Sequence, residues 1–431
     1  MARDSIAAII AYNRRFRGRY PVLLREKIDR MTGSPFGFFR GTYHLFAEDI
    51  AGGGFDPWKM ENPFTTVQIP LVGDIHTENY GTYRALDGRI RYDINDFDET
   101  TEGTFGSDCK RAASSLFLAA YAADRSLSEA TDICSAFVAG YIDAIVGFAR
   151  RGNAGRFGYD DAHPPPSEAI GRLIRSVEQA TRTDFIKRVT LIRKGRRSLA
   201  RGPRLFDLKP AHLRQARRLL EDYRARIGED VEKKSDFFDA LDFAGRVAGC
   251  GSLGRFRYVA LLEGEGSRKA HNIILELKES LPSAFDVARG RKLSAAGRRG
   301  RAEEVTRAAR LMQTCPNRYL GFAVDGDVSF QVREIGPRDA RLVWSDIAKI
   351  KELDLLGEAY ARLLAKAHAK ADEGTPAKGA GLRQIAASLK GREEIFIKRV
   401  TAFALGYSEQ VDEDYRRLVA RRGEVERALL G

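Results

Sequence analysis

The chain has few cysteines and no long apolar run. Its 431 residues include only four cysteines, which have no C-x-x-C spacing and are too sparse for a disulfide framework: Cys109, Cys134, Cys250 and Cys315. The longest apolar stretch, Leu116 to Ala123, is far shorter than the roughly 20 residues that a membrane helix needs. Arginines follow the short apolar run at residues 6–12 instead of preceding it, which is the wrong order for a secretory signal. We therefore expect a reduced, cytoplasmic protein without a membrane segment.

The positive charge of the chain is concentrated in one block. The net charge is +13, and residues 187–226 alone contain 14 Lys and Arg against 3 Asp and Glu, a local charge of +11. Such a block attracts nucleic acid or another polyanion without reading its sequence. The alternative is a solvated helical face, because no zinc-finger, RNA-recognition or helix-turn-helix signature accompanies the block. We expect weak polyanion binding there at most.

Apolar periodicity divides the chain into three parts. Residues 1–245 are mostly helical, with short strands around two polar loops, and the basic block up to about residue 242 is expected to be helical as well. Residues 246–345 have the alternation of β-strands. Residues 346–431 are helical again and begin with a long helix at 353–371. The fold class is therefore α+β, with a large helical lobe and a small antiparallel lobe.

The first polar loop has the sequence GDIHTEN, from Gly73 to Asn79. An Asp followed five residues later by an Asn is the spacing of a kinase catalytic loop, where the Asp accepts the proton of the substrate hydroxyl and the Asn holds Mg²⁺. This pattern predicts Asp74 as a general base and Asn79 as a metal ligand. The alternative is a polar turn in which both side chains bond backbone amides.

The second polar loop follows a strand and is crowded with carboxylates, in the sequence DINDFDE from Asp93 to Glu99. Carboxylates so close together repel one another unless a cation offsets them, and Mg²⁺ prefers such oxygen ligands. Asp96 stands where a kinase has its metal-binding DFG-type aspartate, so we predict Asp96 and Asp98 as metal ligands. The alternative is an acidic turn.

A glycine-rich loop and a lysine occur much later in the chain. The G-x-G-x-x-G pattern at residues 249–254 precedes an alternating strand and not a helix, which excludes the dinucleotide-binding interpretation. A strand–glycine loop–strand hairpin instead covers the phosphates of ATP in kinases. We therefore assign four loop residues to a nucleotide site: Gly249, Gly251, Ser252 and Gly254. Lys278 ends the strand that begins at Ile273, which is the position of a lysine that pairs with the phosphates.

The four motifs stand in the wrong order for an ordinary kinase, because the base and metal loops precede the glycine loop. A circular permutation would explain this order. In kinases the β-rich lobe is followed by a hinge, a long helix and then the catalytic loop. Here a hinge near Glu334, which we include in the nucleotide site, precedes the helix at 353–371. The sequence therefore predicts a two-lobed, circularly permuted, kinase-like fold with catalytic residues Asp74, Asn79, Asp96 and Lys278.

Five runs of the sequence resemble the bacterial domain-of-unknown-function family 2252: SPFGFFRGTYHLF, GDIHTENYG, YDINDFDETTEGTFGSDCKRAASS, GCGSLGRFRYVALLEG and LELKES. That family is similar to aminoglycoside- and choline-type phosphotransferases, whose catalytic loop also reads Gly-Asp-x-His-x-x-Asn. The resemblance implies that Asp74 is the base and that Asn79 and Asp96 bind metal. It also implies supporting roles for three residues, Asp108 against the catalytic loop together with His76 and His368.

The chain departs from the family pattern in one place. The helix after the lysine has Arg307-Ala308-Ala309 where the family has Glu-Gly-Gln. A glutamate partner for Lys278 must then be Glu303 or Glu304, or be absent. The run around Arg40 has no clear kinase counterpart. It is either substrate-facing or a turn that leads into an apolar helix, and we favour the turn.

The expected function is an ATP- and Mg²⁺-dependent phosphotransferase that acts on a hydroxyl of a small molecule. Only 12 residues separate Asp96 from Asp108, which leaves no room for a protein-kinase activation segment. Nucleotidyl transfer (AMPylation) by the same fold remains open, because the same metal ligands serve both reactions. A nucleotide-binding pseudoenzyme and a polyanion-binding module are the non-catalytic alternatives.

Overall fold

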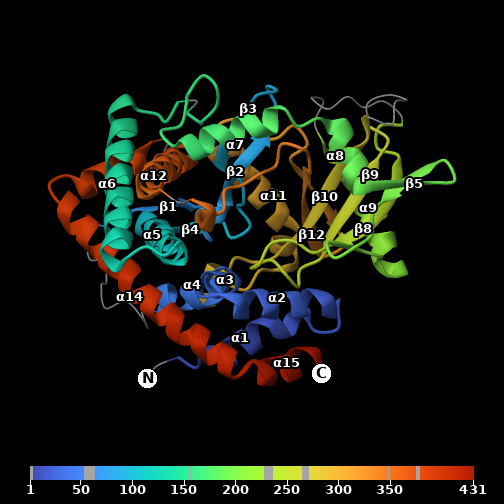
Figure 1. Cartoon of the computed structure of the whole chain (residues 1–431), viewed down its shortest axis with the longest axis horizontal. Helices are drawn as coiled ribbons and strands as arrows, with labels where there is room; N and C mark the ends of the chain where they lie inside the picture. The colour runs from blue at the N-terminus through green and yellow to red at the C-terminus, as the bar shows by residue number, and fades with distance from the viewer. Residues whose placement is uncertain are drawn as a thin grey trace.

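The computed structural model describes residues 3–52, 64–155, 157–227, 236–264, 271–347, 349–374 and 379–431. The protein is a mixed α+β structure with small antiparallel sheets. Helices from both ends of the chain form one side of it (Figure 1). The sequence-based expectation of an α+β class is confirmed.

The N-terminal helices pack together with the two last helices of the chain. They are α1 (Ser5–Asn13), α2 (Pro21–Gly33), α3 (Pro35–Gly41) and α4 (Tyr43–Gly52), with α14 (Glu393–Ala420) and α15 (Arg422–Leu430). Their starts have local causes: the Asp4 carboxylate accepts from the backbone N–H groups of Ile6 and Ala7, and Pro21 and Pro35 occupy first-turn positions where no N–H is needed. Both chain ends therefore lie on the same side of the molecule (Figure 1).

The two polar loops lie beside a group of core helices. The strands next to them form two small antiparallel pairs, β1 (Gln68–Leu71) with β4 (Thr101–Thr104), and β2 (Tyr80–Arg84) with β3 (Ile90–Ile94). The neighbouring helices are α5 (Phe105–Ala122), α6 (Leu127–Arg151), α12 (Ile350–Glu373) and α13 (Ala380–Leu389). One large apolar core joins these elements, so the C-terminal third of the chain completes the region that contains the polar loops.

A six-stranded antiparallel sheet forms the β-rich part, in the order β11-β12-β10-β9-β8-β7. Its strands are β7 (Leu205–Phe206), β8 (Ala240–Arg246), β9 (Arg257–Leu262), β10 (Ile273–Ser280), β11 (Gly321–Asp325) and β12 (Val328–Glu334). The glycine-rich loop connects the paired strands β8 and β9, and Lys278 lies on β10 beside β9. A short helix, α10 (Ala284–Ala288), and a longer one, α11 (Ala295–Met312), separate β10 from β11. The sheet thus begins before residue 246, the boundary expected from periodicity.

The basic block is not entirely helical, and this part of the sequence-based expectation is wrong. After α7 (Glu168–Glu178) and α8 (Arg182–Val189), the chain forms a hairpin of β5 (Thr190–Arg193) and β6 (Arg196–Leu199) before α9 (Pro210–Arg226). Lys194 and Gly195 turn the hairpin with φ values of 48° and 78°. This hairpin extends outward at the edge of the molecule (Figure 1).

Among the described residues, α6 is long and apolar enough to cross a membrane by length and composition alone. Sequence inspection missed it because isolated polar residues interrupt its apolar positions. Its buried residues, such as Phe137 and Tyr141, belong to the large core that α5 and α12 share. The core helix of a folded protein meets the same criteria, so this finding is weak evidence for a membrane span.

Candidate functional site

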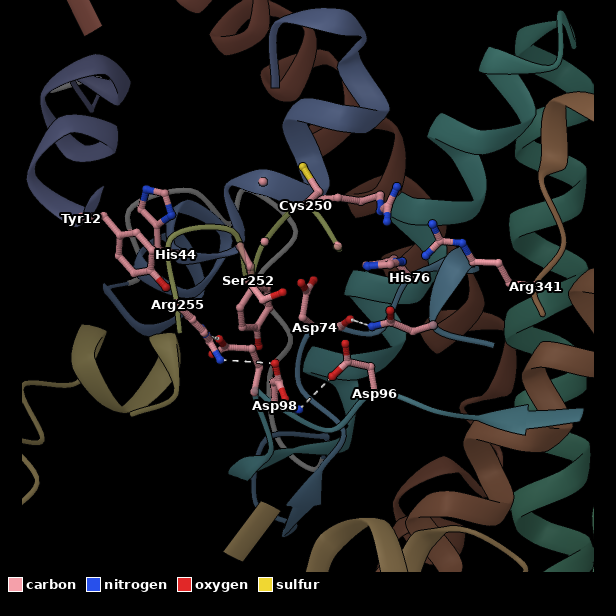
Figure 2. Close-up of a pocket in the computed structure, with 17 residues that line it drawn as sticks. Tyr12, His44, Asp74, His76, Asp96, Asp98, Cys250, Ser252, Arg255 and Arg341 are labelled. Atoms are coloured by element: carbon pink, nitrogen blue, oxygen red, sulfur yellow. Dashed lines mark hydrogen bonds and ion pairs between the residues drawn. The ribbon is translucent and has the colours of Figure 1, made fainter. Parts of the chain in front are cut away.

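One polar cavity collects residues from both polar loops, the glycine-rich loop and the N-terminal helices. It contains about 640 Å³ of space between protein atoms, part of it open to solvent. Eight of the residues predicted from sequence line it: Asp74, His76, Asn79, Asp96, Asp98, Gly249, Gly251 and Ser252. Figure 2 shows Asp74 between two groups of side chains, with Tyr12, His44 and Arg255 on one side and His76 and Arg341 on the other.

Backbone packing brings the two polar loops together. Gly73 has a φ of +97°, and a Cβ atom at this position would lie 2.2 Å from the carbonyl oxygen of Glu99. Only glycine tolerates both the left-handed backbone and this close approach. Asp74 therefore follows β1 at a point where its carboxylate faces the loop that contains Asp96 and Asp98.

The Asp74 carboxylate is held by a buried arginine. Arg111 of α5 donates from Nε at 3.0 Å and from Nη2 at 2.7 Å, both to Oδ1 of Asp74. Burial raises the pKa of the Asp74 carboxyl to about 6, although the Arg111 guanidinium opposes the shift. A carboxylate with this pKa is ionised at neutral pH yet accepts a proton readily, which suits a general base.

The Asn79 side chain is oriented by the backbone of the same loop. Its Nδ2 donates to the carbonyl oxygen of Asp74 at 2.5 Å. Because the amide group is planar, this bond directs Oδ1 away from the Asp74 backbone and leaves it available as an oxygen ligand. Asn79 and Asp74 thus belong to one rigid turn, which includes the short 3₁₀ helix Thr77–Asn79.

Asp96 lies beside the lysine of the β-rich part. Nζ of Lys278 is 3.1 Å from Oδ2 of Asp96, and it also pairs with Asp98. Burial favours the protonated form of Asp96, but the charges of Lys278 and Arg257 outweigh this effect and lower the pKa of Asp96 to about 2. Asp96 is therefore ionised at every physiological pH, while its side chain remains 40% exposed.

Asp98 has one carboxylate oxygen in ion pairs and one without a partner. Oδ2 accepts from Arg255 at 3.3 Å, while Oδ1 is buried and has no hydrogen-bond partner among the described residues. Burial and the neighbouring Asp96 carboxylate raise the pKa of Asp98. An unpaired buried carboxylate oxygen is unfavourable unless a proton or a cation approaches it.

Three oxygen donors at the cavity are of the type that Mg²⁺ prefers. They are the amide oxygen of Asn79, the exposed carboxylate of Asp96 and the unpartnered Oδ1 of Asp98. No group of three or more His, Cys, Asp or Glu suited to a metal ion occurs among the described residues. Water and phosphate oxygens would therefore complete the shell, which is usual for Mg²⁺.

Helix α2 holds the glycine-rich loop from outside the cavity. Nζ of Lys27 donates to the carbonyl oxygen of Gly251 at 3.0 Å, and Arg30 donates to that of Gly249. In a trans peptide the C=O and N–H groups point in opposite directions. The N–H groups of the next residues, Cys250 and Ser252, therefore point away from α2, and both residues line the cavity.

Gly254 has a different role from the other glycines of the loop. It does not line the cavity, and its φ is +102°. A Cβ atom there would lie 2.6 Å from the ring of Phe16. Packing against the N-terminal segment, together with the left-handed backbone, therefore accounts for glycine at this position.

Asp108 and His368 lie directly behind the first polar loop. The Asp108 carboxylate accepts from the backbone N–H groups of Val72 at 2.8 Å and Gly73 at 3.1 Å. Nε2 of His368, on α12, is 3.1 Å from Oδ2 of Asp108, and Nδ1 is 2.8 Å from the Tyr141 hydroxyl. All of these groups are buried, so they fix the backbone that carries Asp74.

His76 lines the cavity as a neutral ring. Its Nδ1 accepts from the backbone N–H of Glu78 at 3.2 Å. Burial and the nearby guanidinium groups of Arg40 and Arg111 lower the pKa of His76 well below its usual range. Since Nδ1 is an acceptor in a neutral ring, the proton is on Nε2, which is then a donor.

Several cavity residues had no signal in the sequence. Arg40 was interpreted as part of a turn, but it lines the cavity and its Nη1 is 2.9 Å from Oε1 of Glu78. Tyr12 and His44 stack with ring centroids 3.9 Å apart, and both nitrogens of the buried His44 lack partners among the described residues. Arg40 and His44 lie in the family run SPFGFFRGTYHLF, but no chemical pattern assigned them or Tyr12 to the site. Only the packing of the N-terminal helices brings these residues to the polar loops.

Two predictions about glutamates do not agree with the structure: Glu334 in the nucleotide site, and Glu303 or Glu304 as the partner of Lys278. Glu334 does not line the cavity, and its carboxylate pairs with Arg182 at 2.6 Å. Neither candidate glutamate of α11 is the partner of Lys278: Glu303 is exposed, and Glu304 pairs with Arg301 at 2.9 Å. The recorded partners of Lys278 are the carboxylates of Asp96 and Asp98.

The fold and the site define a mixed α+β protein with a charged cavity between its helical part and a small antiparallel sheet. The chain belongs to the bacterial family described as "Uncharacterized protein conserved in bacteria (DUF2252)", whose model matches residues 19–421. The family resemblance drawn from the sequence motifs is thus confirmed. No curated protein and no solved structure matches the chain.

Proposed function

We propose that the protein is an ATP- and Mg²⁺-dependent phosphotransferase that acts on a hydroxyl group of a small molecule. One observation carries the proposal: Asp74, Asn79 and Asp96 share a cavity with the glycine-rich loop, and Lys278 contacts Asp96. A base, metal ligands, a phosphate-binding loop and a lysine are the parts that phosphoryl transfer requires.

Contacts between distant segments support a circularly permuted, kinase-like arrangement. Lys278 lies on β10, the third of the consecutive strands β8, β9 and β10, of which the first two flank the glycine-rich loop. A lysine on such a third strand, followed by a helix, corresponds to the lysine and the αC helix of kinases. The long helix α12 follows the sheet and contacts the catalytic region through His368 and Asp108. In a kinase the chain would continue from this helix into the catalytic loop, which here is supplied by residues 73–79.

Each residue then has a chemical role. Asp74 takes the proton of the acceptor hydroxyl while that oxygen forms a bond to the γ-phosphorus of ATP. The bond from the γ-phosphorus to the β,γ-bridging oxygen breaks, and ADP leaves. Lys278 and the N–H groups of the glycine-rich loop bind phosphate oxygens in the ground state and the transition state. Mg²⁺ held by Asn79, Asp96 and Asp98 would neutralise charge on the phosphates.

A small acceptor agrees with the helices that border the cavity. Helices α1, α3 and α4 supply Tyr12, Arg40 and His44, respectively, to the lining. Lys27 and Arg30 of α2 also bond the outer side of the glycine-rich loop. A folded protein substrate would have to displace these helices, whereas a small molecule would not.

Nucleotidyl transfer is the second candidate, and one cluster of charges favours it. The carboxylate of Glu276 is fully buried and is shared by Arg246, Arg257 and Arg333. Two of these arginines, Arg257 and Arg333, also lower the pKa of Asp96. Such an excess of positive charge suits the phosphate chain of ATP better than its adenine. If the terminal phosphates lay at these arginines, ATP would be bound in the reverse direction and would present its α-phosphate for transfer.

The experiment that tests the proposal uses water as the acceptor. The full-length protein is incubated with ATP and Mg²⁺, and nucleotide products are separated while the melting temperature is recorded. ADP with phosphate would indicate phosphoryl transfer, and AMP with pyrophosphate would indicate nucleotidyl transfer. A wild-type protein with neither product and no ATP-dependent rise in melting temperature would refute both.

Asp74→Asn provides the internal control. This change removes the base but no metal ligand, so the ATP-dependent rise in melting temperature should persist. Turnover should fall by roughly 10²- to 10⁴-fold, the usual contribution of a general base. If Asp74→Asn abolished nucleotide binding instead, Asp74 would be part of the nucleotide site and its assigned role would be wrong.

A further inference from the structure

An arginine pair at one end of the cavity has more positive charge than its surroundings neutralise. Nη1 of Arg40 is 2.9 Å from Oε1 of Glu78, and Nη1 of Arg341 is 3.2 Å from Oε2 of the same carboxylate. Two guanidinium groups therefore share a single carboxylate. Arg40 comes from α3 and Arg341 from the segment after the sheet, so the fold, and not local sequence, creates the pair.

Two further polar groups of Arg40 and His76 at this end are donors. Nε of Arg40 is buried and has no hydrogen-bond partner within the described part of the chain. Nε2 of the neutral His76 carries a proton, because Nδ1 accepts from the Glu78 backbone. A group that satisfies Nε of Arg40 and Nε2 of His76 must accept hydrogen bonds.

The surroundings of Arg341 also favour an anion. Burial lowers the pKa of Arg341, and the charges of Arg40, Arg30 and Arg204 lower it further, while Glu78 alone raises it. The side chain of Arg341 is 48% exposed, so it can reach a bound molecule without breaking the core. Charge-assisted bonds from arginine to carboxylate or phosphate are among the strongest that proteins form.

The arginine pair is close to the position assigned to the reacting hydroxyl. Arg40, His76 and Arg341 line the same cavity as Asp74. In Figure 2, His76 and Arg341 lie to one side of Asp74, opposite Tyr12 and His44. The carbonyl oxygen of Arg40 would be 2.9 Å from a Cβ atom at Gly251, so Arg40 also borders the glycine-rich loop.

We infer that the acceptor is an anionic hydroxy compound, whose carboxylate or phosphate group is bound by Arg40 and Arg341 while its hydroxyl faces Asp74. This inference rests on the proposed function for the role of Asp74, but the anion site itself does not. His76 donates from Nε2 to the same anionic group. The bound anion restores the balance of charge that Glu78 alone does not provide.

Titration with simple anions tests this inference without knowledge of the natural acceptor. Inorganic phosphate and acetate are titrated separately, at constant ionic strength, into the full-length wild type and the variants Arg40→Gln, Arg341→Gln and Arg416→Gln. Arg416 is a 76% exposed arginine of α14 and serves as the charge-matched control. The melting temperature gives the dissociation constant for each anion.

The wild type should bind at least one of the two anions. Arg40→Gln and Arg341→Gln should each raise the dissociation constant about tenfold or more, the contribution of one charge-assisted hydrogen bond. Arg416→Gln should leave the dissociation constant unchanged. Binding of phosphate alone would indicate a phosphate ester as the acceptor, and binding of acetate a carboxylic acid. Anion binding that is absent, or equal in all four proteins, would overturn the inference.

A second measurement separates this site from the nucleotide site. Arg341→Gln should retain the wild-type shift in melting temperature with ATP and Mg²⁺. Loss of that shift would assign Arg341 to the nucleotide and overturn the acceptor site. If the wild type itself does not respond to ATP, the proposed function fails, while the phosphate and acetate titrations still decide whether the anion site exists.

Discussion

Nζ of Lys278 lies 3.1 Å from Oδ2 of Asp96, although 182 residues separate the two in the chain. Lys278 is on a central strand of the antiparallel sheet, and Asp96 follows a hairpin of the helical part. The ion pair therefore joins the two parts at the cavity. The positive charge of Lys278 contributes to the low pKa of Asp96, about 2, and so keeps ionised the carboxylate that we propose as a metal ligand.

Replacement of Asp96 by Asn should separate metal-dependent from metal-independent nucleotide binding. The amide is a poorer ligand for Mg²⁺, and Lys278 keeps a charged partner in Asp98. A ligand at a hundredfold excess over its dissociation constant stabilises a protein by about 2.7 kcal/mol, and the variant should lose most of the Mg²⁺-dependent part of this gain. Thermal shifts with ATP, with and without Mg²⁺, measure the effect.

The matched control for this substitution is Asp327→Asn. Asp327 lies in the β11–β12 turn, is 57% exposed and also pairs with arginines. Its replacement should leave both thermal shifts at the wild-type values. Equal Mg²⁺-dependent shifts in wild type and Asp96→Asn would show that Asp96 binds no metal.

The pKa of Asp74 predicts the acid limit of activity. A base must be ionised, and burial raises the pKa of Asp74 to about 6. The value of kcat/KM for ATP turnover should therefore be constant above that pH and fall about tenfold per pH unit below it. The residual activity of Asp74→Asn should lack this decline at low pH. A wild-type decline centred near pH 4 would contradict the raised pKa of Asp74, and a decline near pH 6 that persists in Asp74→Asn would exclude Asp74 as the titrating group.

The basic β5–β6 hairpin should matter for polyanions and not for catalysis. Its charged residues lie outside the cavity, and Ile192 beside them is 54% exposed. The test variant replaces four residues of the hairpin by Gln: Arg193, Lys194, Arg196 and Arg197. This variant should be retained less on nucleic acid, and its retention should depend less on salt concentration. Turnover of ATP should stay within about threefold, since surface changes far from a site rarely alter it.

A second fourfold variant controls for the loss of charge. It replaces four arginines near the C-terminal end by Gln: Arg416, Arg417, Arg421 and Arg422. If this variant reduced nucleic-acid retention as much as the hairpin variant does, net charge and not the hairpin would explain the binding. A folded hairpin variant without ATP turnover would instead assign the hairpin to the substrate site.

The sequence predicted the residues whose spacing is local. Asp74 and Asn79 lie on one turn, and the glycine-rich loop lies between two strands, so short-range patterns were sufficient to find them. Arg40 and His44 lie in a run that identified the family but has no known chemistry, and Tyr12 lies outside it, so none of the three was assigned to the site. Each comes from a different N-terminal helix, and only tertiary packing of those helices against the polar loops brings them to the cavity.

The main error in secondary structure also has a local cause. The high content of Lys and Arg favoured a helix throughout the basic block, because both residues are good helix formers. Thr190, Leu191 and Ile192 favour a strand, and Gly195 supports the positive φ that the hairpin turn needs. Here the β-branched residues and the glycine determined the structure, while the charges remained on the surface.

A buried ion pair connects α12 to β3 and could not be inferred from the sequence. Nζ of Lys366 is 2.6 Å from Oδ2 of Asp93, and both side chains are 0% exposed. Lys366 also donates to the carbonyl oxygen of Met312 at 2.9 Å. Asp93 stands three residues before Asp96, so the pair fixes the strand that leads into the loop with Asp96 and Asp98.

Replacement of Lys366 by Met should therefore destabilise the protein strongly. Loss of the ammonium group leaves the Asp93 carboxylate buried without a cation, which typically costs about 3–5 kcal/mol. The double variant Lys366→Met/Asp93→Asn should recover part of this loss, because the amide is neutral and can still accept from the backbone N–H of Thr314, which donates to Asp93 in the wild type.

The control variant is Lys370→Met, one turn along α12 from Lys366 and partly exposed. It should change the free energy of unfolding by less than about 0.5 kcal/mol. Urea unfolding of the four proteins measures these differences in the free energy of unfolding. A Lys366→Met variant as stable as the wild type would contradict the role of the ion pair in joining α12 to the strand before Asp96.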